Sequence, residues 1–309
     1  MSIFWRLRKI PKILLKEKNV QGRWFRLLIG TAIGLFLFYY SFREVDWVIF
    51  WQSFGKTNLW FLLPALLGVV VYLLIKAWRW QILLENGLDI SKKRIWQSSV
   101  IGAAFNIFLP YLGEAVRGIR VGQGKDKSFI FSTIIFEKII DSVFLLLVIY
   151  FFSYYLEFPD WFRNGINIFS YFVLVALLVA LIIPKIRSIL PQWAGGKLAS
   201  EFLNWKLLVR LFLITILSWL VLTLVYAQVA ASLGIMLSFW AYLFLVCFLY
   251  IGLSIPSAPG YIGVYQFLIL FGLSFFGVGK ELALAYSFVI YLALALPTGL
   301  LGWYYLVKG

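Results

Sequence analysis

Residues 211–279 read LFLITILSWLVLTLVYAQVAASLGIMLSFWAYLFLVCFLYIGLSIPSAPGYIGVYQFLILFGLSFFGVG and contain no Asp, Glu, Lys or Arg. A helix needs about 20 apolar residues to cross the hydrocarbon core of a bilayer, so this stretch can cross more than once. In its middle, residues 254–263 (SIPSAPGYIG) hold two prolines and two glycines. Pro removes a backbone donor and Gly frees the backbone dihedrals, so a continuous helix is disfavoured there. An uncharged break predicts backbone that turns at membrane depth; the alternative is a short turn between two ordinary spans.

The composition of the whole chain supports the same class of protein. The 309 residues are 63% hydrophobic and 13% charged, whereas an ordinary soluble domain has about 45–50% apolar and about 25% charged residues. These values exclude a soluble enzyme and a disordered chain, and they predict an all-α, polytopic membrane helix bundle. The chain has no His, which excludes a His general base and a Ser-His-Asp triad. Its single Cys, Cys247, excludes an intrachain disulfide and a thiolate zinc cluster. We therefore predict no metal site and no cofactor.

Apolar runs along the rest of the chain predict further membrane spans. The predicted spans are residues 27–41, 59–80, 128–153, 167–184, 207–233 and 282–306, and less regular apolar regions cover 96–113 and 236–279. Residues 1–26 are rich in Lys and Arg with apolar residues at helical spacing, which predicts a basic amphipathic segment at the cytoplasmic interface. A headgroup anchor is predicted at the end of the second span, from Lys76, Trp78, Arg79 and Trp80.

The basic residues also predict the orientation. The net charge is +15, from 28 Lys and Arg against 13 Asp and Glu, but the basic residues flank apolar spans and so do not indicate nucleic-acid binding. If region 96–113 enters the membrane and returns to the same side, most of the basic residues and both termini lie on the cytoplasmic side. The opposite side then holds only Arg43, Lys56, Arg163 and Lys280. We therefore expect a re-entrant segment at 96–113 in a multi-pass protein of the cell membrane.

The two irregular regions occupy similar places in two halves of the chain. We predict a single transmembrane domain over residues 27–309, with pseudo-repeats at about 27–153 and 167–306. In the predicted topology the first break is entered from the inside and the second from the outside. Paired broken helices of opposite orientation are typical of transporters built from inverted repeats, whose binding site lies near the midplane between the breaks.

The first break is followed by polar residues that suit an anionic headgroup. Residues 104–120 read AFNIFLPYLGEAVRGIR, and Glu114 and Arg117 are three residues apart, so they can pair on one helix face. Gly113 is expected to allow a turn out of the broken segment, and Arg120 follows on the same side of the helix. Arg offers a planar fork for phosphate, and broken helix ends offer free amides. The alternative is that the arginines only extend to the cytoplasmic interface, which leaves Glu114 and Asn106 unexplained.

A second group of charges lies inside an otherwise apolar span. Glu137, Lys138 and Asp141 fall near the middle of span 128–153, where each charge costs about 2.5–3.5 kcal/mol unless it meets a partner or water. Glu137 and Asp141 are four residues apart and share a helix face. One of them is therefore protonated, or both share a cation such as Arg117 or Lys138. The group is either a substrate or proton-coupling site or a structural ion cluster between helices.

Three motifs give the chain a resemblance to the lysylphosphatidylglycerol synthase transmembrane, or flippase-like, family. They are Asn106-x-x-x-Pro110-x-x-Gly113-Glu114-x-x-Arg117, then Glu137-Lys138-x-x-Asp141, and Pro256-x-x-Pro259-Gly260-x-x-Gly263-Val264. Relatives often have Arg at the position of Lys138, and many have an acid near Gln266. The resemblance implies a membrane module that moves a lipid or a lipid-linked headgroup between leaflets. We expect a stand-alone module without the aminoacyl- or glycosyltransferase domain of some relatives, and therefore no enzymatic activity.

The leading hypothesis is thus a lipid transporter that acts on an anionic or lipid-linked headgroup, either as a homo-oligomer or with a partner transferase. The residues predicted to bind or pass the substrate are Asn106, Pro110, Gly113, Glu114, Arg117, Arg120, Glu137, Lys138, Asp141, Pro256, Pro259, Gly260 and Gly263. One alternative is a membrane-embedded transferase for lipid-linked substrates, with Glu44 and Asp46 of the first outer loop as its candidate acids. Another is a scaffold whose buried charges only fix helix packing.

Overall fold

The computed structural model describes residues 20–85, 87–108, 112–122, 126–155, 204–254 and 259–308, together with a few single positions between 160 and 171. Every regular element in these ranges is a helix, which confirms the predicted all-α membrane helix bundle. Residues 1–19 of the predicted basic segment and nearly all of the predicted span 167–184 lie outside the described residues, as do Pro110 and Pro256.

The predicted spans that fall on described residues correspond to helices. The order is α3 (Val20–Phe42), α4 (Trp47–Gly55), α5 (Leu59–Glu85), α6 (Lys92–Phe108), α7 (Leu112–Val121), α8 (Lys127–Phe152), α12 (Trp205–Ser232), α13 (Phe239–Gly252), the 3₁₀ turn η1 (Pro259–Tyr261), α14 (Val264–Ser274) and α15 (Lys280–Lys308). Within the described part of the chain, α5, α12 and α15 are long and apolar enough to cross a membrane. Helix α8 is comparably long but carries Glu137, Lys138 and Asp141 in its middle.

Each irregular region corresponds to a pair of shorter helices, but the first pair extends to Val121, past the predicted end at residue 113. The first pair is α6 and α7, which pack against each other, and the second is α13 and α14, which do the same around η1. The start of α6 and the end of α7 lie together, because the Arg94 Nη2 donates to the backbone oxygen of Arg120 at 2.9 Å. The first region is therefore a helix hairpin, which we call the first hairpin (α6–α7); the second hairpin is α13–η1–α14.

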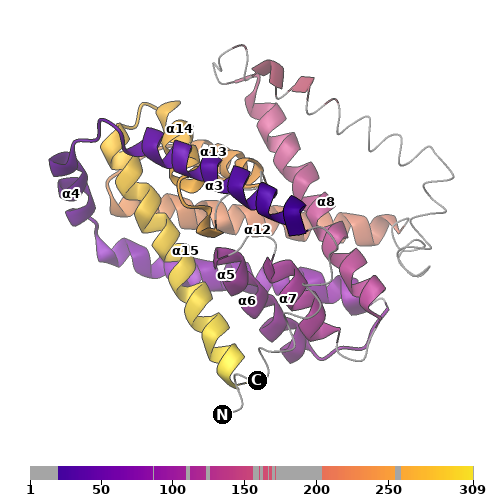
Figure 1. Ribbon diagram of the computed structural model, residues 1–309. Coiled ribbons are helices and arrows are strands. Elements are labelled where there is room, and N and C mark those ends of the chain that lie inside the picture. Colours follow the sequence, from indigo (N-terminus) through magenta and orange to yellow (C-terminus); the bar gives the residue numbers. More distant parts are fainter. Residues whose placement is uncertain are drawn as a thin grey trace.

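The contacts between helices correspond between the two halves of the chain. Helices α5 and α12 pack side by side (Figure 1). The pair α5·α6 matches α12·α13, α7·α8 matches α14·α15, and α6·α15 matches α13·α8. Each half thus provides a central helix, a hairpin, and a last helix that packs against the hairpin of the other half. The inverted orientation of the two halves across a membrane stays a prediction.

The sequence did not indicate helix α4, which lies between α3 and α5 in the predicted first outer loop. It begins because the Asp46 carboxylate accepts hydrogen bonds from the backbone N–H groups of Val48 (2.8 Å) and Ile49 (3.1 Å), an ordinary helix N-cap. The helix buries Phe50 and exposes Trp47 and Trp51.

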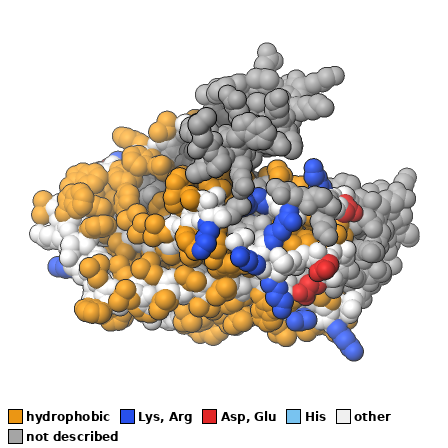
Figure 2. All heavy atoms as spheres, turned by 90° about the horizontal axis from the view of Figure 1, so that it is seen from below, with side chains coloured by type: hydrophobic (Ala, Val, Ile, Leu, Met, Phe, Trp, Pro, Cys, Tyr) orange, Lys and Arg blue, Asp and Glu red, His pale blue; other side chains and the backbone are white. Residues whose placement is uncertain are grey.

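Hydrophobic side chains cover much of the outside of the molecule, as expected for a surface that faces lipid. On the face drawn in Figure 2, Lys, Arg and the acidic side chains gather toward one part, and hydrophobic side chains occupy most of the rest. This separation of charged from apolar surface fits a protein that lies in a membrane and meets water over limited regions.

Candidate functional site

A buried network of ion pairs connects the first hairpin to helices α5 and α8. At its centre lies Arg79 of α5, whose side chain is 1% exposed. Arg79 Nη1 and Nη2 donate to the two carboxylate oxygens of Asp141 at 2.6 and 2.9 Å, and Nε donates to Glu137 Oε1 at 3.2 Å. The hydroxyl oxygen of Thr215 on α12 accepts a further bond from Nη1 at 2.7 Å. One guanidinium thus neutralises two carboxylates that would otherwise repel each other.

Arg117 of α7 continues the network toward the hairpin. Its Nη2 donates to Glu137 Oε2 at 2.7 Å. Its Nε lies 2.6 Å from Glu114 Oε2, as an ion pair without a hydrogen bond. The Nζ of Lys138 lies 2.7 Å from the other oxygen of Glu114. The predicted Glu114–Arg117 pair is therefore present, and Arg117 also pairs with Glu137. The cation that Glu137 and Asp141 share is Arg79 and not Arg117 or Lys138, the two examples that the sequence suggested.

The ring of Trp80 helps to hold the Arg117 guanidinium in place. Its central carbon lies 4.6 Å from the centroid of the Trp80 ring, a distance suited to a cation–π contact. The Trp80 indole N–H donates to the Thr133 hydroxyl at 3.0 Å, which fixes the ring between α5 and α8. Trp80 and Arg79 are both buried, so the sequence-based interpretation of these two residues as a headgroup anchor is wrong. The long-range partners on α8 keep them inside the bundle.

Small residues allow the two helices of the first hairpin to approach closely. A Cβ atom added to Gly113 would lie 1.9 Å from the backbone oxygen of Gly102. The Gly113 N–H donates to Asn106 Oδ1 at 2.8 Å, and the amide nitrogen of Asn106 donates to Glu114 at 3.4 Å. Gly113 lies within α7 and is not among the described glycines with positive φ. Its predicted role in a turn is therefore wrong: it serves close packing.

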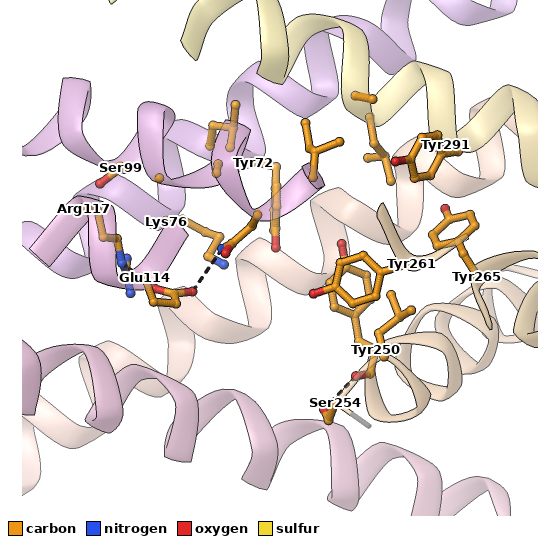
Figure 3. Close-up of a pocket in the computed structure, with 18 of the residues that line it drawn as sticks. Tyr72, Lys76, Ser99, Glu114, Arg117, Tyr250, Ser254, Tyr261, Tyr265 and Tyr291 are labelled. Atoms are coloured by element: carbon orange, nitrogen blue, oxygen red, sulfur yellow. Dashed lines mark hydrogen bonds and ion pairs between the residues drawn. The ribbon is translucent and has the colours of Figure 1, made fainter. Parts of the chain in front are cut away.

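A cavity of about 320 Å³ lies between the first hairpin and the second. Its charged wall comes from α5–α8 and holds Lys76, Asn106, Glu114, Arg117 and Lys138. Its opposite wall is aromatic and holds tyrosines from α5, α13, η1, α14 and α15: Tyr72, Tyr250, Tyr261, Tyr265 and Tyr291. Figure 3 shows the two walls, with Lys76, Glu114 and Arg117 on one side and Tyr250, Tyr261, Tyr265 and Tyr291 on the other.

Lys76 lines the cavity but forms no ion pair with the described residues of the network. The three carboxylates of Glu114, Glu137 and Asp141 are matched by Arg79, Arg117 and Lys138, and no described carboxylate lies within ion-pair distance of Lys76. Its Nζ lies 5.5 Å from the centroid of the Tyr72 ring. Ser99 of α6 lines the same cavity, and its buried hydroxyl has no hydrogen-bond partner among the described residues. The charged wall therefore has one positive charge to offer a ligand.

Tyr261 of the second hairpin is positioned by a backbone turn with positive φ angles. Gly260 and Tyr261 both have positive φ, 73° and 56°, and for a non-glycine residue this conformation costs about 1–2 kcal/mol. Gly263 has a φ of 86°, and its N–H donates to Gln266 Oε1 at 2.8 Å. Gln266 thus caps the start of α14. The Pro259–Gly263 segment turns the chain so that Tyr261 reaches the cavity.

The predicted site residues separate into groups. Asn106, Glu114, Arg117 and Lys138 line the cavity, and Glu137 and Asp141 lie behind that wall. Arg120 does not line it; its backbone oxygen holds Arg94. Gly260 and Gly263 shape the second hairpin. The roles of all these residues in substrate binding stay predictions.

The sequence analysis missed Lys76 as a cavity residue, Arg79 as an ion-pair partner, and the tyrosines. One signal was available: Tyr72, Lys76 and Arg79 follow each other at intervals of four and three residues, which places them on one helix face. The other four cavity tyrosines gave no such signal, because they come from four different elements.

These features define a class: a polytopic membrane protein with a small polar cavity enclosed between two helix hairpins. The family described as the lysylphosphatidylglycerol synthase TM region matches residues 27–302. The chain belongs to this family, which associates it with membrane lipids. No curated protein matches the chain.

Proposed function

We propose that the protein moves a lipid with an anionic headgroup between the two leaflets of the membrane. The observation that carries the proposal is the cavity between the hairpins, whose charged wall leaves Lys76 without a carboxylate partner among the described residues. A cation in a mostly apolar surrounding favours an anionic ligand. Phosphate of a lipid headgroup supplies such an anion.

The position of the cavity supports transport. In transporters with broken helices, the substrate site lies between the breaks, and rearrangement of one half against the other opens it to either side. Here the cavity has one wall from each hairpin. The alternative of a transferase in the first outer loop receives less support, because the Asp46 carboxylate already caps helix α4.

Substitution of Lys76 with Met tests this proposal. We expect the rate at which a fluorescent phosphatidylglycerol crosses the membrane of reconstituted vesicles to fall about 10–100-fold, the effect of losing one hydrogen bond to a charged group. The rate is measured from the fraction of fluorophore that dithionite reaches with time. Lys76 is outside the ion-pair network, so the variant should unfold at the wild-type temperature.

Lys93→Met is the matched control, since Lys93 is exposed at the start of α6 and does not line the cavity. It should transport at the wild-type rate. If Lys76→Met also transports at that rate, the cavity is not the pathway. If the wild-type protein gives no translocation above empty vesicles for any phospholipid, the transport function itself is wrong.

We also propose that the first hairpin is re-entrant, with the starts of α6 and α8 on the cytoplasmic side. The contact between Arg94 and Arg120, which brings the open end of the hairpin together, supports this arrangement. Cys247 is buried and provides an unreactive background. Single cysteines at Lys93 and Lys127 should react with a membrane-impermeant maleimide only from the cytoplasmic side, and one at Lys56 only from the other. Labelling of Lys93→Cys and Lys127→Cys from opposite sides would mean that the hairpin region crosses the membrane.

A further inference from the structure

The aromatic wall of the cavity presents hydroxyl groups. In Figure 3 the hydroxyl ends of Tyr72, Tyr250 and Tyr261 are directed toward the same part of the cavity, with Tyr265 and Tyr291 beside them. The Tyr291 hydroxyl has no hydrogen-bond partner among the described residues, whereas that of Tyr265 lies 3.1 Å from the hydroxyl of Tyr226. A tyrosine hydroxyl both donates and accepts a hydrogen bond, so this wall suits a ligand with hydroxyl groups of its own.

The tyrosine rings are less suited to a cationic headgroup. A cage for an ammonium group needs free ring faces, but other side chains already pack on these rings. Lys76 lies over the Tyr72 ring, Trp219 packs edge-to-face on Tyr250 at 5.0 Å, and Tyr265 on Tyr291 at 5.4 Å. No described acidic residue lines the tyrosine wall of the cavity. Its one carboxylate, that of Glu114, is held by Arg117 and Lys138.

We infer that the cavity selects an anionic lipid whose phosphate carries a sugar or another polyol, with the phosphate at Lys76 and the hydroxyl groups at the tyrosines. This inference rests on the proposed function only in taking the cavity as a lipid site. A volume of about 320 Å³ is at the lower end of the range for small-molecule sites. It suits a polar headgroup and leaves the acyl chains outside.

Lipid binding to the purified full-length chain tests the inference. The probes are phosphatidylinositol, phosphatidic acid and phosphatidylethanolamine with identical acyl chains, and the measurement is titration by native mass spectrometry in one detergent. We expect phosphatidylinositol to bind about tenfold or more tighter than phosphatidic acid, although phosphatidic acid carries at least as much negative charge. That factor corresponds to two additional hydrogen bonds of ordinary strength. Phosphatidylethanolamine should bind weakest.

The double variant Tyr261→Phe, Tyr291→Phe removes two hydroxyl groups and keeps both rings. Its affinity for phosphatidylinositol should fall about tenfold, to that of phosphatidic acid, while its affinity for phosphatidic acid stays the same. Tyr39→Phe is the matched control, since Tyr39 is an exposed tyrosine of α3 that does not line the cavity. Equal binding of phosphatidylinositol and phosphatidic acid by the wild-type chain, or an unchanged preference in the double variant, would overturn the inference.

The test separates this inference from the proposed function, because binding is measured without transport. A chain that prefers phosphatidylinositol but moves no lipid in vesicles supports the headgroup selection and contradicts the transport function. A chain that moves lipids at equal rates and binds all three probes equally contradicts the selection and leaves the transport function in place.

Discussion

Replacement of Arg79 with Met is expected to prevent the protein from accumulating in a folded form. The substitution removes the cation that Glu137 and Asp141 share inside the bundle, and it leaves both carboxylate oxygens of Asp141 without their Arg79 partner. Removing one partner from a buried ion pair costs about 3–5 kcal/mol, because the remaining charge stays uncompensated. The measurement is the yield of monodisperse protein in detergent and, where enough is recovered, its thermal unfolding.

A compensated variant distinguishes loss of charge balance from loss of packing. The double variant Arg79→Met, Asp141→Asn has no unbalanced charge at this position, because Glu137 keeps its pair with Arg117 and Glu114 keeps its pairs with Arg117 and Lys138. We expect it to recover most of the folded yield. If Arg79→Met alone is as stable as the wild type, the network does not hold α5 and α8 together; if the double variant fails equally, the guanidinium acts through its packing.

Replacement of Gly113 with Ala is expected to destabilise the first hairpin. The added Cβ would lie 1.9 Å from the backbone oxygen of Gly102 and 2.5 Å from Cγ of Asn106, so α6 and α7 must move apart. Overpacking of this kind costs about 1–3 kcal/mol, and loss of the Asn106–Gly113 hydrogen bond adds about 1 kcal/mol. Thermal unfolding should show a lower midpoint, and transport should fall because Glu114 and Arg117 move with α7.

Gly299→Ala is the matched control. Gly299 lies inside α15, and a Cβ there meets no atom within 4 Å. Since Ala is a better helix former than Gly, this variant should be as stable as the wild type or more stable by about 0.5–1 kcal/mol. A midpoint for Gly113→Ala equal to that of Gly299→Ala would show that the hairpin tolerates a wider separation.

The sequence determined the class of the protein and the positions of its long helices. Apolar runs and the placement of charges predicted α5, α8, α12 and α15 and the break in each half, because hydrophobicity and helix breakers act over a few neighbouring residues. The same local reasoning predicted the Glu114–Arg117 pair, since residues three apart on a helix face each other. For the buried acids Glu137 and Asp141, a shared cation was one of the two alternatives that the sequence left open, and the structure contains such a cation.

Only the tertiary structure decided which cation that is and where the cavity lies. Arg79 resembles an interfacial anchor in the sequence, and its partners on α8 are 58 and 62 residues away. The tyrosines of the cavity come from five elements, and Gly113 has its function only against Gly102. Spacing along a chain reports which residues share one helix face. It carries no information on which faces of separate helices meet, because that depends on how all the side chains between them pack.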